Sequence, residues 1–149
     1  MATAYIALGT NLGNLEQNLN NAVAALGRVP GVQVTARSKR YKTEPVGYTE
    51  QPDFLNAAVR VETTRSPEAL LGACLGIEAA MGRVRTVKNG PRVLDLDLLL
   101  YENETRSTAE LTLPHPRMLE RTFVLQPLCD ICKEPLYHQK LKELTHAGE

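Results

Sequence analysis

The 149-residue chain has no tryptophan and two phenylalanines, and aromatic residues make up 5% of it. Its seventeen basic and seventeen acidic side chains cancel to a formal net charge of zero. RNA-recognition domains need an aromatic and basic sheet face, and anionic membranes attract proteins with an excess of positive charge. We therefore expect no nucleic-acid partner and no membrane partner. Any anion must be bound by a local cluster of basic residues.

Long apolar runs and an even set of cysteines are also missing. No run approaches the ~20 residues of a membrane span, and the first residues do not resemble a secretory signal. Three cysteines are an odd count, which argues against the disulfide framework of small secreted proteins. We expect a cytoplasmic monomer with reduced thiols. The length is typical of one domain, which we place at residues 1–149.

Hydrophobic periodicity predicts an alternation of strands and helices. Strands are expected at 5–8, 32–41, 54–62 and 93–101, and helices at 15–26 and 67–81, with N-caps at Asn14 and Ser66. Loops are expected at 43–52 and 83–92, an extended piece at 111–114, and short helices around 118–128 and 139–144. The order strand, helix, strand, strand, helix, strand predicts an α+β fold of the ferredoxin-like split βαβ type, an antiparallel sheet with helices packed on it.

Two aspartates stand two positions apart in a leucine-rich strand. Side chains two apart share a strand face, so Asp95 and Asp97 project together, while Leu94, Leu96 and Leu98 point into the core. At ~7 Å and an effective dielectric of ~20, two such charges repel by roughly 2 kcal/mol. A divalent cation would offset this repulsion, and oxygen ligands without histidine suit magnesium. The alternative is an exposed strand face with two solvated aspartates.

Three arginines precede the aspartates. Arg83, Arg85 and Arg92 lie within the segment that leads into the strand, which would bring them beside the carboxylates. Guanidinium groups match phosphate oxygens, with ~1.5–3 kcal/mol for each charge-assisted contact. A metal with arginines indicates a polyphosphate site, unless the arginines only form salt bridges to the aspartates. Because the sequence has no P-loop and no G-x-G-x-x-G motif, side chains would have to hold a nucleotide.

Three further features stay open on the residues alone. Phe54 and Asn56 share a strand face and suit a flat heterocycle, but a core phenylalanine and a turn-capping asparagine explain them equally well. His115 stands between two prolines and is either structural or a phosphate contact. Cys129 and Cys132 form a C-x-x-C without the context of a zinc or redox site, so we expect packing residues.

Five segments together resemble the 6-hydroxymethyl-7,8-dihydropterin pyrophosphokinase family of the folate pathway. They are YIALGTNLG at 5–13, QPDFLNAAV at 51–59, Glu78 with GRVR at 82–85, GPR with LDLD between 90 and 97, and PHPRM with Arg121 and Phe123 between 114 and 123. The resemblance implies a ferredoxin-like fold and transfer of the β,γ-diphosphate of ATP to the pterin hydroxymethyl group, with AMP as leaving group. The chain departs from some members at Glu44, at Asn89 and at Pro116, where they have proline, tryptophan and tyrosine.

The resemblance also implies residue roles. Asp95 and Asp97 would bind two Mg²⁺ ions that bridge the triphosphate of the co-substrate ATP, and Arg83 and Arg92 would join them in catalysis. The residues implied for ATP are Glu78, Arg83, Arg85, Arg92, Leu98, Thr112, His115 and Arg121. The residues implied for the pterin are Thr43, Val46, Gly47, Phe54, Asn56 and Phe123, with the ring between the two phenylalanines. The alternatives are a ferredoxin-like nucleotide- or RNA-binding module without catalysis and a two-metal phosphohydrolase.

Overall fold

The structure, a computed structural model, describes residues 1–45, 50–82 and 92–147. In this part of the chain, an antiparallel sheet has the strand order β2-β4-β1-β5, and β3 pairs with the start of β4. Its strands are β1 (Ala2–Thr10), β2 (Val32–Arg37), β3 (Tyr41–Thr43), β4 (Phe54–Thr63) and β5 (Asp95–Tyr101). The order of strands and helices along the chain confirms the expected ferredoxin-like α+β fold.

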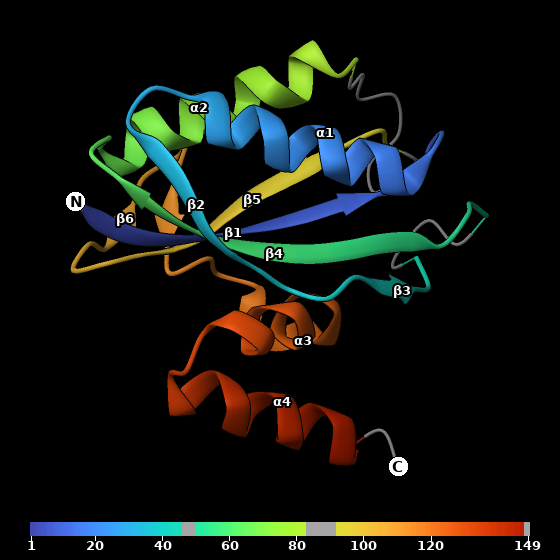
Figure 1. Ribbon diagram of the computed structural model, residues 1–149. Coiled ribbons are helices and arrows are strands. Elements are labelled where there is room, and N and C mark those ends of the chain that lie inside the picture. Colours follow the sequence, from blue (N-terminus) through green and yellow to red (C-terminus); the bar gives the residue numbers. More distant parts are fainter. Residues whose placement is uncertain (46–49, 83–91, 148–149) are drawn as a thin grey trace.

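Helices cover both faces of the sheet (Figure 1). One face carries α1 (Leu15–Arg28) and α2 (Pro67–Ala80), and the other carries α3 (Thr122–Ile131), on which α4 (Pro135–Ala147) packs. Between β5 and α3 the chain forms β6 (Arg106–Ser107), β7 (Thr112–Leu113) and the single 3₁₀ turn η1 (Met118–Glu120). None of the helices within the described ranges has the length and hydrophobicity needed to cross a membrane.

Local sequence sets the starts of α1 and α2. The side chain of Asn14 accepts a hydrogen bond from the Gln17 backbone N–H at 3.1 Å, and Ser66 accepts one from the Ala69 N–H at 3.1 Å. Both contacts satisfy N–H groups that have no partner within the helix, as expected for N-caps. Both helices therefore begin where the sequence predicts.

Two apolar cores share the sheet. The larger lies under α1 and α2 and contains buried residues such as Ile6, Leu8 and Leu96. The smaller lies under α3 and α4 and contains Leu99 and Leu125. It also takes in Cys132, with Cys129 packed against it, in agreement with the expected packing role of the C-x-x-C.

Several predicted boundaries differ from the structure, among them the first strand, expected at 5–8 and observed as Ala2–Thr10, and the helix expected around 118–128, observed as η1 and α3. The strand expected at 32–41 is divided into β2 and β3 by Ser38, whose N–H donates to the Ala58 carbonyl at 2.9 Å while its Oγ accepts from the Ala58 N–H at 2.8 Å. The side chain of Ser38 thus replaces the backbone partner that a regular ladder would supply. The strand expected at 93–101 begins at Asp95, and the last helix begins at Pro135 rather than at Gln139.

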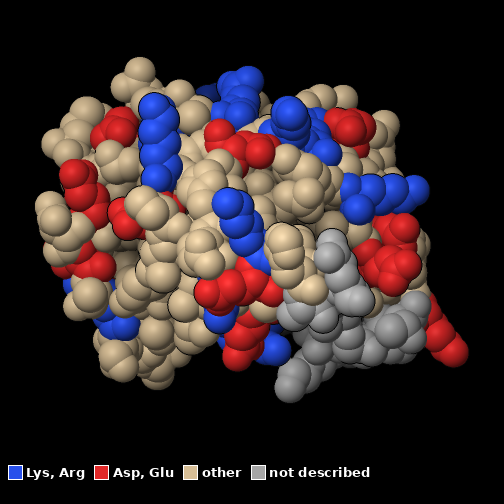
Figure 2. All heavy atoms as spheres, turned by 90° about the horizontal axis from the view of Figure 1, so that it is seen from below, with Lys and Arg blue, Asp and Glu red and all other residues tan. Residues whose placement is uncertain are grey.

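Charged side chains are mixed on the surface. Figure 2 shows basic and acidic residues interspersed over the face on the side of α4. This distribution agrees with the zero formal net charge of the sequence.

Candidate active site

Two rows of residues cross the sheet beside α3 and form the floor of a hollow. The β-ladders align Asn56 with Gly9 and Gly9 with Asp95, and in the next row Ala58 with Ala7 and Ala7 with Asp97. The middle strand contributes Gly9 and Ala7, whose small size leaves space between Asn56 and the aspartates of the outer strands. Neighbouring strands are ~4.8 Å apart, which separates the outer members of a row by about 10 Å.

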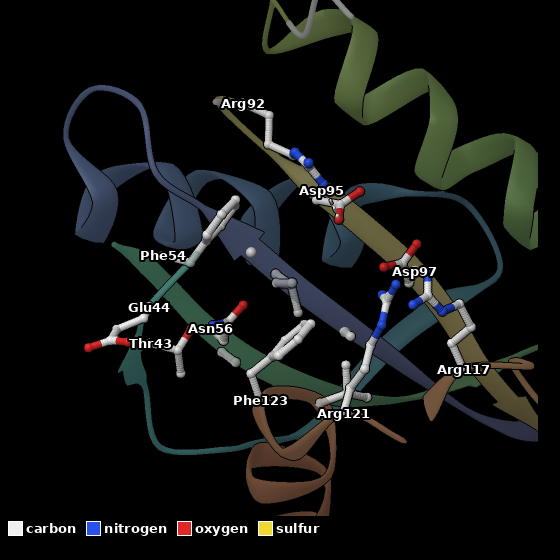
Figure 3. A pocket seen from close by; sticks show the side chains of 15 residues that line it. Thr43, Glu44, Phe54, Asn56, Arg92, Asp95, Asp97, Arg117, Arg121 and Phe123 are labelled. Atoms are coloured by element: carbon white, nitrogen blue, oxygen red, sulfur yellow. Dashed lines mark hydrogen bonds and ion pairs between the residues drawn. The ribbon is translucent and has the colours of Figure 1, made fainter. Parts of the chain in front are cut away.

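The hollow has a volume of about 780 Å³ with its open mouth included. Its walls come from β1, β3, β4, the start of β5, and the segment around α3 (Figure 3). Eight residues predicted for the site line it: Thr43, Phe54, Asn56, Arg92, Asp95, Asp97, Arg121 and Phe123.

Arginines flank both aspartates. Arg92 Nη1 lies 3.2 Å from Asp95 Oδ2, and the two side chains are 18% and 25% exposed. At the other end, Figure 3 shows the guanidinium groups of Arg117 and Arg121 directed toward Asp97. The sheet face therefore carries a pair of carboxylates between cations, the arrangement expected for a metal-bound polyphosphate.

The carboxylate pair fits magnesium but does not form a complete protein cage. Within residues 1–45, 50–82 and 92–147, no group of three or more His, Cys, Asp or Glu side chains could hold a metal ion. Magnesium is usually bound through one or two carboxylates, with water and substrate phosphates completing its shell. Asp95 and Asp97 supply this number of carboxylates.

The opposite half of the hollow is aromatic. Phe54 at the start of β4 and Phe123 in the first turn of α3 both line it. The guanidinium carbon of Arg92 lies 5.4 Å from the centroid of the Phe54 ring, and that of Arg121 lies 5.5 Å from the centroid of the Phe123 ring. Asn56 is 7% exposed, and its Nδ2 donates a hydrogen bond to Thr43 Oγ1. A planar ligand would meet ring faces and one oriented carboxamide here.

His115 lies near the carboxylate end of the hollow, where the charges of Arg121 and Asp95 act on it. Its backbone N–H donates to the Leu99 carbonyl at 2.9 Å, and its Nδ1 accepts from the Arg117 backbone N–H at 3.3 Å. Burial lowers the pKa of His115 from its ordinary value, and the charge of Arg121 lowers it further. The ring is therefore neutral near pH 7, with its proton on Nε2, where it can donate to an anion.

Besides His115, which is not part of the lining, three further residues predicted to contact ATP lie away from the lining of the hollow. Glu78 on α2 is 5% exposed, and its Oε2 accepts from the Leu96 N–H at 2.7 Å, which ties α2 to β5 between the two aspartates. Leu98 is buried in the larger core, and Thr112 lies in β7. Their predicted nucleotide contacts stay predictions. The predicted site residues Val46, Gly47, Arg83 and Arg85 lie outside the described residues.

Sequence reasoning missed three residues that shape the site. Gly9 forms the middle of a row, Asn11 is 2% exposed at the end of β1, and Arg117 lines the hollow. All three occur in segments 5–13 and 114–118, which resemble the pyrophosphokinase family. That signal marks the segments but does not separate these residues from their neighbours.

Comparison with known proteins identifies the family. The family model for 7,8-dihydro-6-hydroxymethylpterin-pyrophosphokinase (HPPK) matches residues 5–133. The chain belongs to the HPPK family. The 2-amino-4-hydroxy-6-hydroxymethyldihydropteridine pyrophosphokinase of Bacillus subtilis (strain 168) is 50% identical over 131 residues, which cover 88% of this chain and 78% of that protein. The enzyme of the same name from Methylorubrum extorquens (strain AM1) is 48% identical over 134 residues, which cover 90% of this chain and 85% of that protein.

Solved structures with an HPPK part share the fold. A crystal structure of an HPPK-DHPS in complex with substrates has a TM-score of 0.76 and 13% identity, and covers 98% of this chain. This chain spans 44% of that longer protein. The folic acid synthesis protein fol1 of Schizosaccharomyces pombe is also longer. It is 41% identical over 143 residues, which cover 94% of this chain and 20% of that protein. The HPPK unit thus occurs both in proteins near the length of this chain and within longer ones.

Proposed function

We propose that this chain transfers the terminal diphosphate of ATP to the hydroxymethyl group of 6-hydroxymethyl-7,8-dihydropterin in folate biosynthesis, and that the hollow beside α3 is its active site. Membership of the HPPK family supports the reaction. One geometric observation carries the location: a single row joins Asn56 to Asp95 through Gly9. This row brings a heterocycle-reading amide and a metal-binding carboxylate into one hollow.

In this proposal the ATP end lies along β5. Asp95 and Asp97 would hold two magnesium ions, which when bound neutralise charge on the phosphate oxygens. Arg92 and Arg121 would contact the phosphates from opposite ends, and His115 would donate through Nε2. Arg83 and Arg85, predicted from the sequence for the same role, would complete the set of cations.

The pterin end lies between the two phenylalanines. The ring would stack between Phe54 and Phe123, while Asn56 with Thr43 would read its pyrimidine edge. The row spacing of about 10 Å then brings the exocyclic hydroxymethyl group toward the carboxylates on β5.

The chemistry is a displacement at the β-phosphorus. The hydroxymethyl oxygen forms a bond to this phosphorus, the bond to the oxygen bridging the α- and β-phosphates breaks, and AMP leaves. The hydroxyl proton passes to a carboxylate oxygen of Asp97. Positioning of both substrates, together with neutralisation of phosphate charge, would account for most of the acceleration, as in other phosphoryl transfers.

Product analysis tests the reaction. The chain is incubated with ATP, Mg²⁺ and 6-hydroxymethyl-7,8-dihydropterin, and the products are separated and counted. We expect AMP and pterin diphosphate in equal amounts. Free phosphate would instead indicate a phosphohydrolase, and absence of turnover would indicate a binding module.

Replacement of an aspartate tests the location. Asp97→Ala is expected to abolish turnover while changing the free energy of unfolding by less than about 1 kcal/mol, because at this partly exposed position the attraction lost to Arg117 and Arg121 is opposed by the repulsion relieved from Asp95. Glu143→Gln on α4 is the matched control for loss of one negative charge outside the hollow. An Asp97→Ala protein with the activity of this control would remove the assignment of the site.

A further inference from the structure

We propose that Arg117 is an additional phosphate-binding residue of this enzyme, which strengthens binding of the magnesium–ATP complex without contributing to the chemical step. The inference rests on the proposed function of the hollow. It adds a cation at the mouth of the site that neither the motif of the two aspartates nor the implied ATP contacts contained.

The position of Arg117 carries the first part of the argument. Its side chain lines the hollow, and Figure 3 shows its guanidinium group directed toward Asp97 beside that of Arg121. The side chain is 61% exposed, compared with 18% for Arg92. Arg117 therefore lies at the rim, where a polyanion arriving from solvent meets it before the deeper arginine.

The partner of Arg117 holds it weakly. Its Nε lies 3.7 Å from Glu120 Oε2, and the Glu120 side chain is 71% exposed. Exposed ion pairs of this kind contribute about 0–1 kcal/mol, and a contact between arginine and phosphate is stronger because the anion carries more charge and more acceptor oxygens. The guanidinium group can thus exchange Glu120 for a phosphate at little cost.

Positive charge also accumulates at this end of the hollow. Burial lowers the pKa of both Arg121 and His115, and the charge of Arg117 adds a smaller lowering to each. The Arg117 backbone N–H, which donates to His115 Nδ1, keeps the two residues together. An anion bound among them would relieve their repulsion, so the site favours a highly charged ligand such as the ATP triphosphate.

Exposure predicts which kinetic constant Arg117 controls. A contact at the rim forms equally in the complex with ATP and in the transition state, so it lowers the dissociation constant and leaves kcat unchanged. It is also screened by salt. Arg117 should therefore act on ATP affinity and on its salt dependence.

Direct binding measurements test the inference. The probe is an ATP analogue with a methylene group in place of the oxygen between the α- and β-phosphates. This analogue lacks the bond that breaks in the reaction, and it is used together with Mg²⁺. Arg117→Gln is expected to raise its dissociation constant about tenfold, equivalent to about 1.4 kcal/mol, and to make it less dependent on salt. The dissociation constant of Arg117→Lys should lie between those of the wild-type and Arg117→Gln proteins. The kcat of Arg117→Gln should stay within about twofold of the wild-type value.

Two control variants separate phosphate binding from a structural effect. Lys140→Gln removes the cation of another exposed i,i+3 pair, with Glu143 at 3.5 Å on α4, outside the hollow. Glu120→Gln removes the surface partner of Arg117 and should not weaken analogue binding. Equal affinities for the Arg117→Gln and Lys140→Gln proteins would overturn the inference, as would Glu120→Gln weakening binding as much as Arg117→Gln does.

Wild-type behaviour distinguishes failure of this inference from failure of the proposed function. If the wild-type protein forms AMP and pterin diphosphate while Arg117→Gln binds the analogue normally, only the role of Arg117 is wrong. If the wild-type protein forms neither product, the proposed function itself is wrong.

Discussion

Asn11 and Arg92 are joined by two hydrogen bonds across 81 positions of sequence: the Arg92 N–H donates to Asn11 Oδ1 at 2.9 Å, and the Asn11 N–H donates to the Arg92 carbonyl at 3.1 Å. The same carboxamide donates through Nδ2 to Gln51 Oε1 at 2.8 Å and to the Pro52 carbonyl at 3.0 Å. One buried side chain thus connects the end of β1 to the residues preceding Phe54 and to the arginine beside Asp95. It aligns both halves of the hollow.

Replacement of Asn11 should therefore affect stability and both substrates together. We expect Asn11→Ala to lower the free energy of unfolding by about 2–3 kcal/mol, because it leaves buried polar groups without partners. The KM values for ATP and for the pterin should both rise. Denaturant unfolding and steady-state kinetics measure the two effects.

Asn11→Asp is the matched variant for this prediction. It keeps the oxygen that accepts from Arg92 and removes both donors to Gln51 and Pro52. It should impair pterin binding more than binding of the ATP analogue. The opposite order would contradict the assigned division of contacts.

Gly9 provides the space in which Asn56 is oriented. A Cβ at Gly9 would lie 3.0 Å from Asn56 Oδ1, closer than ordinary contact, so the carboxamide must move. We expect Gly9→Ala to raise the KM for the pterin about tenfold, equivalent to about 1.4 kcal/mol, and to leave analogue binding unchanged. The restriction that alanine places on the unfolded chain should offset part of the stability lost to this crowding.

The control for Gly9→Ala is Gly76→Ala on α2, where an added Cβ would have no atom within 4 Å apart from its chain neighbours and its own helix backbone. Its KM for the pterin should match that of the wild-type enzyme. A Gly9→Ala enzyme with the same KM as this control would show that the pterin does not use Asn56.

The lowered pKa of His115 predicts how stability depends on pH. Burial disfavours the charged ring, so the folded protein binds this proton more weakly than the unfolded chain, whose histidine titrates near 6.5. Between the two pKa values the unfolded state holds more protons, and stability therefore rises with pH through this window. Above this pH window the ring is neutral in both states and His115 does not affect stability. Below the window the ring is charged in both states, and the full cost of burying that charge lowers the stability of the folded protein.

His115→Gln should remove this dependence. The stability of the wild-type protein relative to the variant is expected to fall as pH decreases from about 7 through the lowered pKa. Urea unfolding of both proteins at several pH values measures the difference. A difference that stays constant with pH would contradict the burial of a neutral ring.

Asp130 ties the strand that carries Thr43 to α3. Its Oδ2 accepts from the Lys39 N–H at 3.0 Å and from the Tyr41 hydroxyl at 2.7 Å. Burial, followed by the hydrogen bond and charge of Asp130, raises the pKa of Tyr41 to about 12. Because the folded pKa lies above the unfolded value near 10, this contribution to stability is complete below pH 10 and is lost as pH rises toward 12.

Tyr41→Phe should lower stability by about 1 kcal/mol at neutral pH, the net value of one hydrogen bond. Asp130→Asn should bring the pKa of Tyr41 closer to 10, because it removes the negative charge. The phenolate absorbance, with Tyr41→Phe subtracted to isolate one of the five tyrosines, measures this shift. An unchanged titration in Asp130→Asn would contradict the contact.

Much of the fold followed from short-range patterns. Asn14 and Ser66 started their helices as predicted, because an N-cap acts on N–H groups two or three residues away. The division of β2 from β3 was missed because it depends on Ser38 meeting Ala58, twenty positions distant in the chain. Alternation within 32–41 contains no sign of that contact.

The sequence alone determined that Asp95 and Asp97 share one face, because the pleat of a strand alternates side chains whatever surrounds them. It also placed the strands and helices in ferredoxin-like order. Only the tertiary structure decided that this face meets Asn56 across Gly9, that Asn11 aligns Arg92, and that Arg117 reaches the same hollow. These relationships join distant residues through strand register and helix packing, which no local pattern specifies.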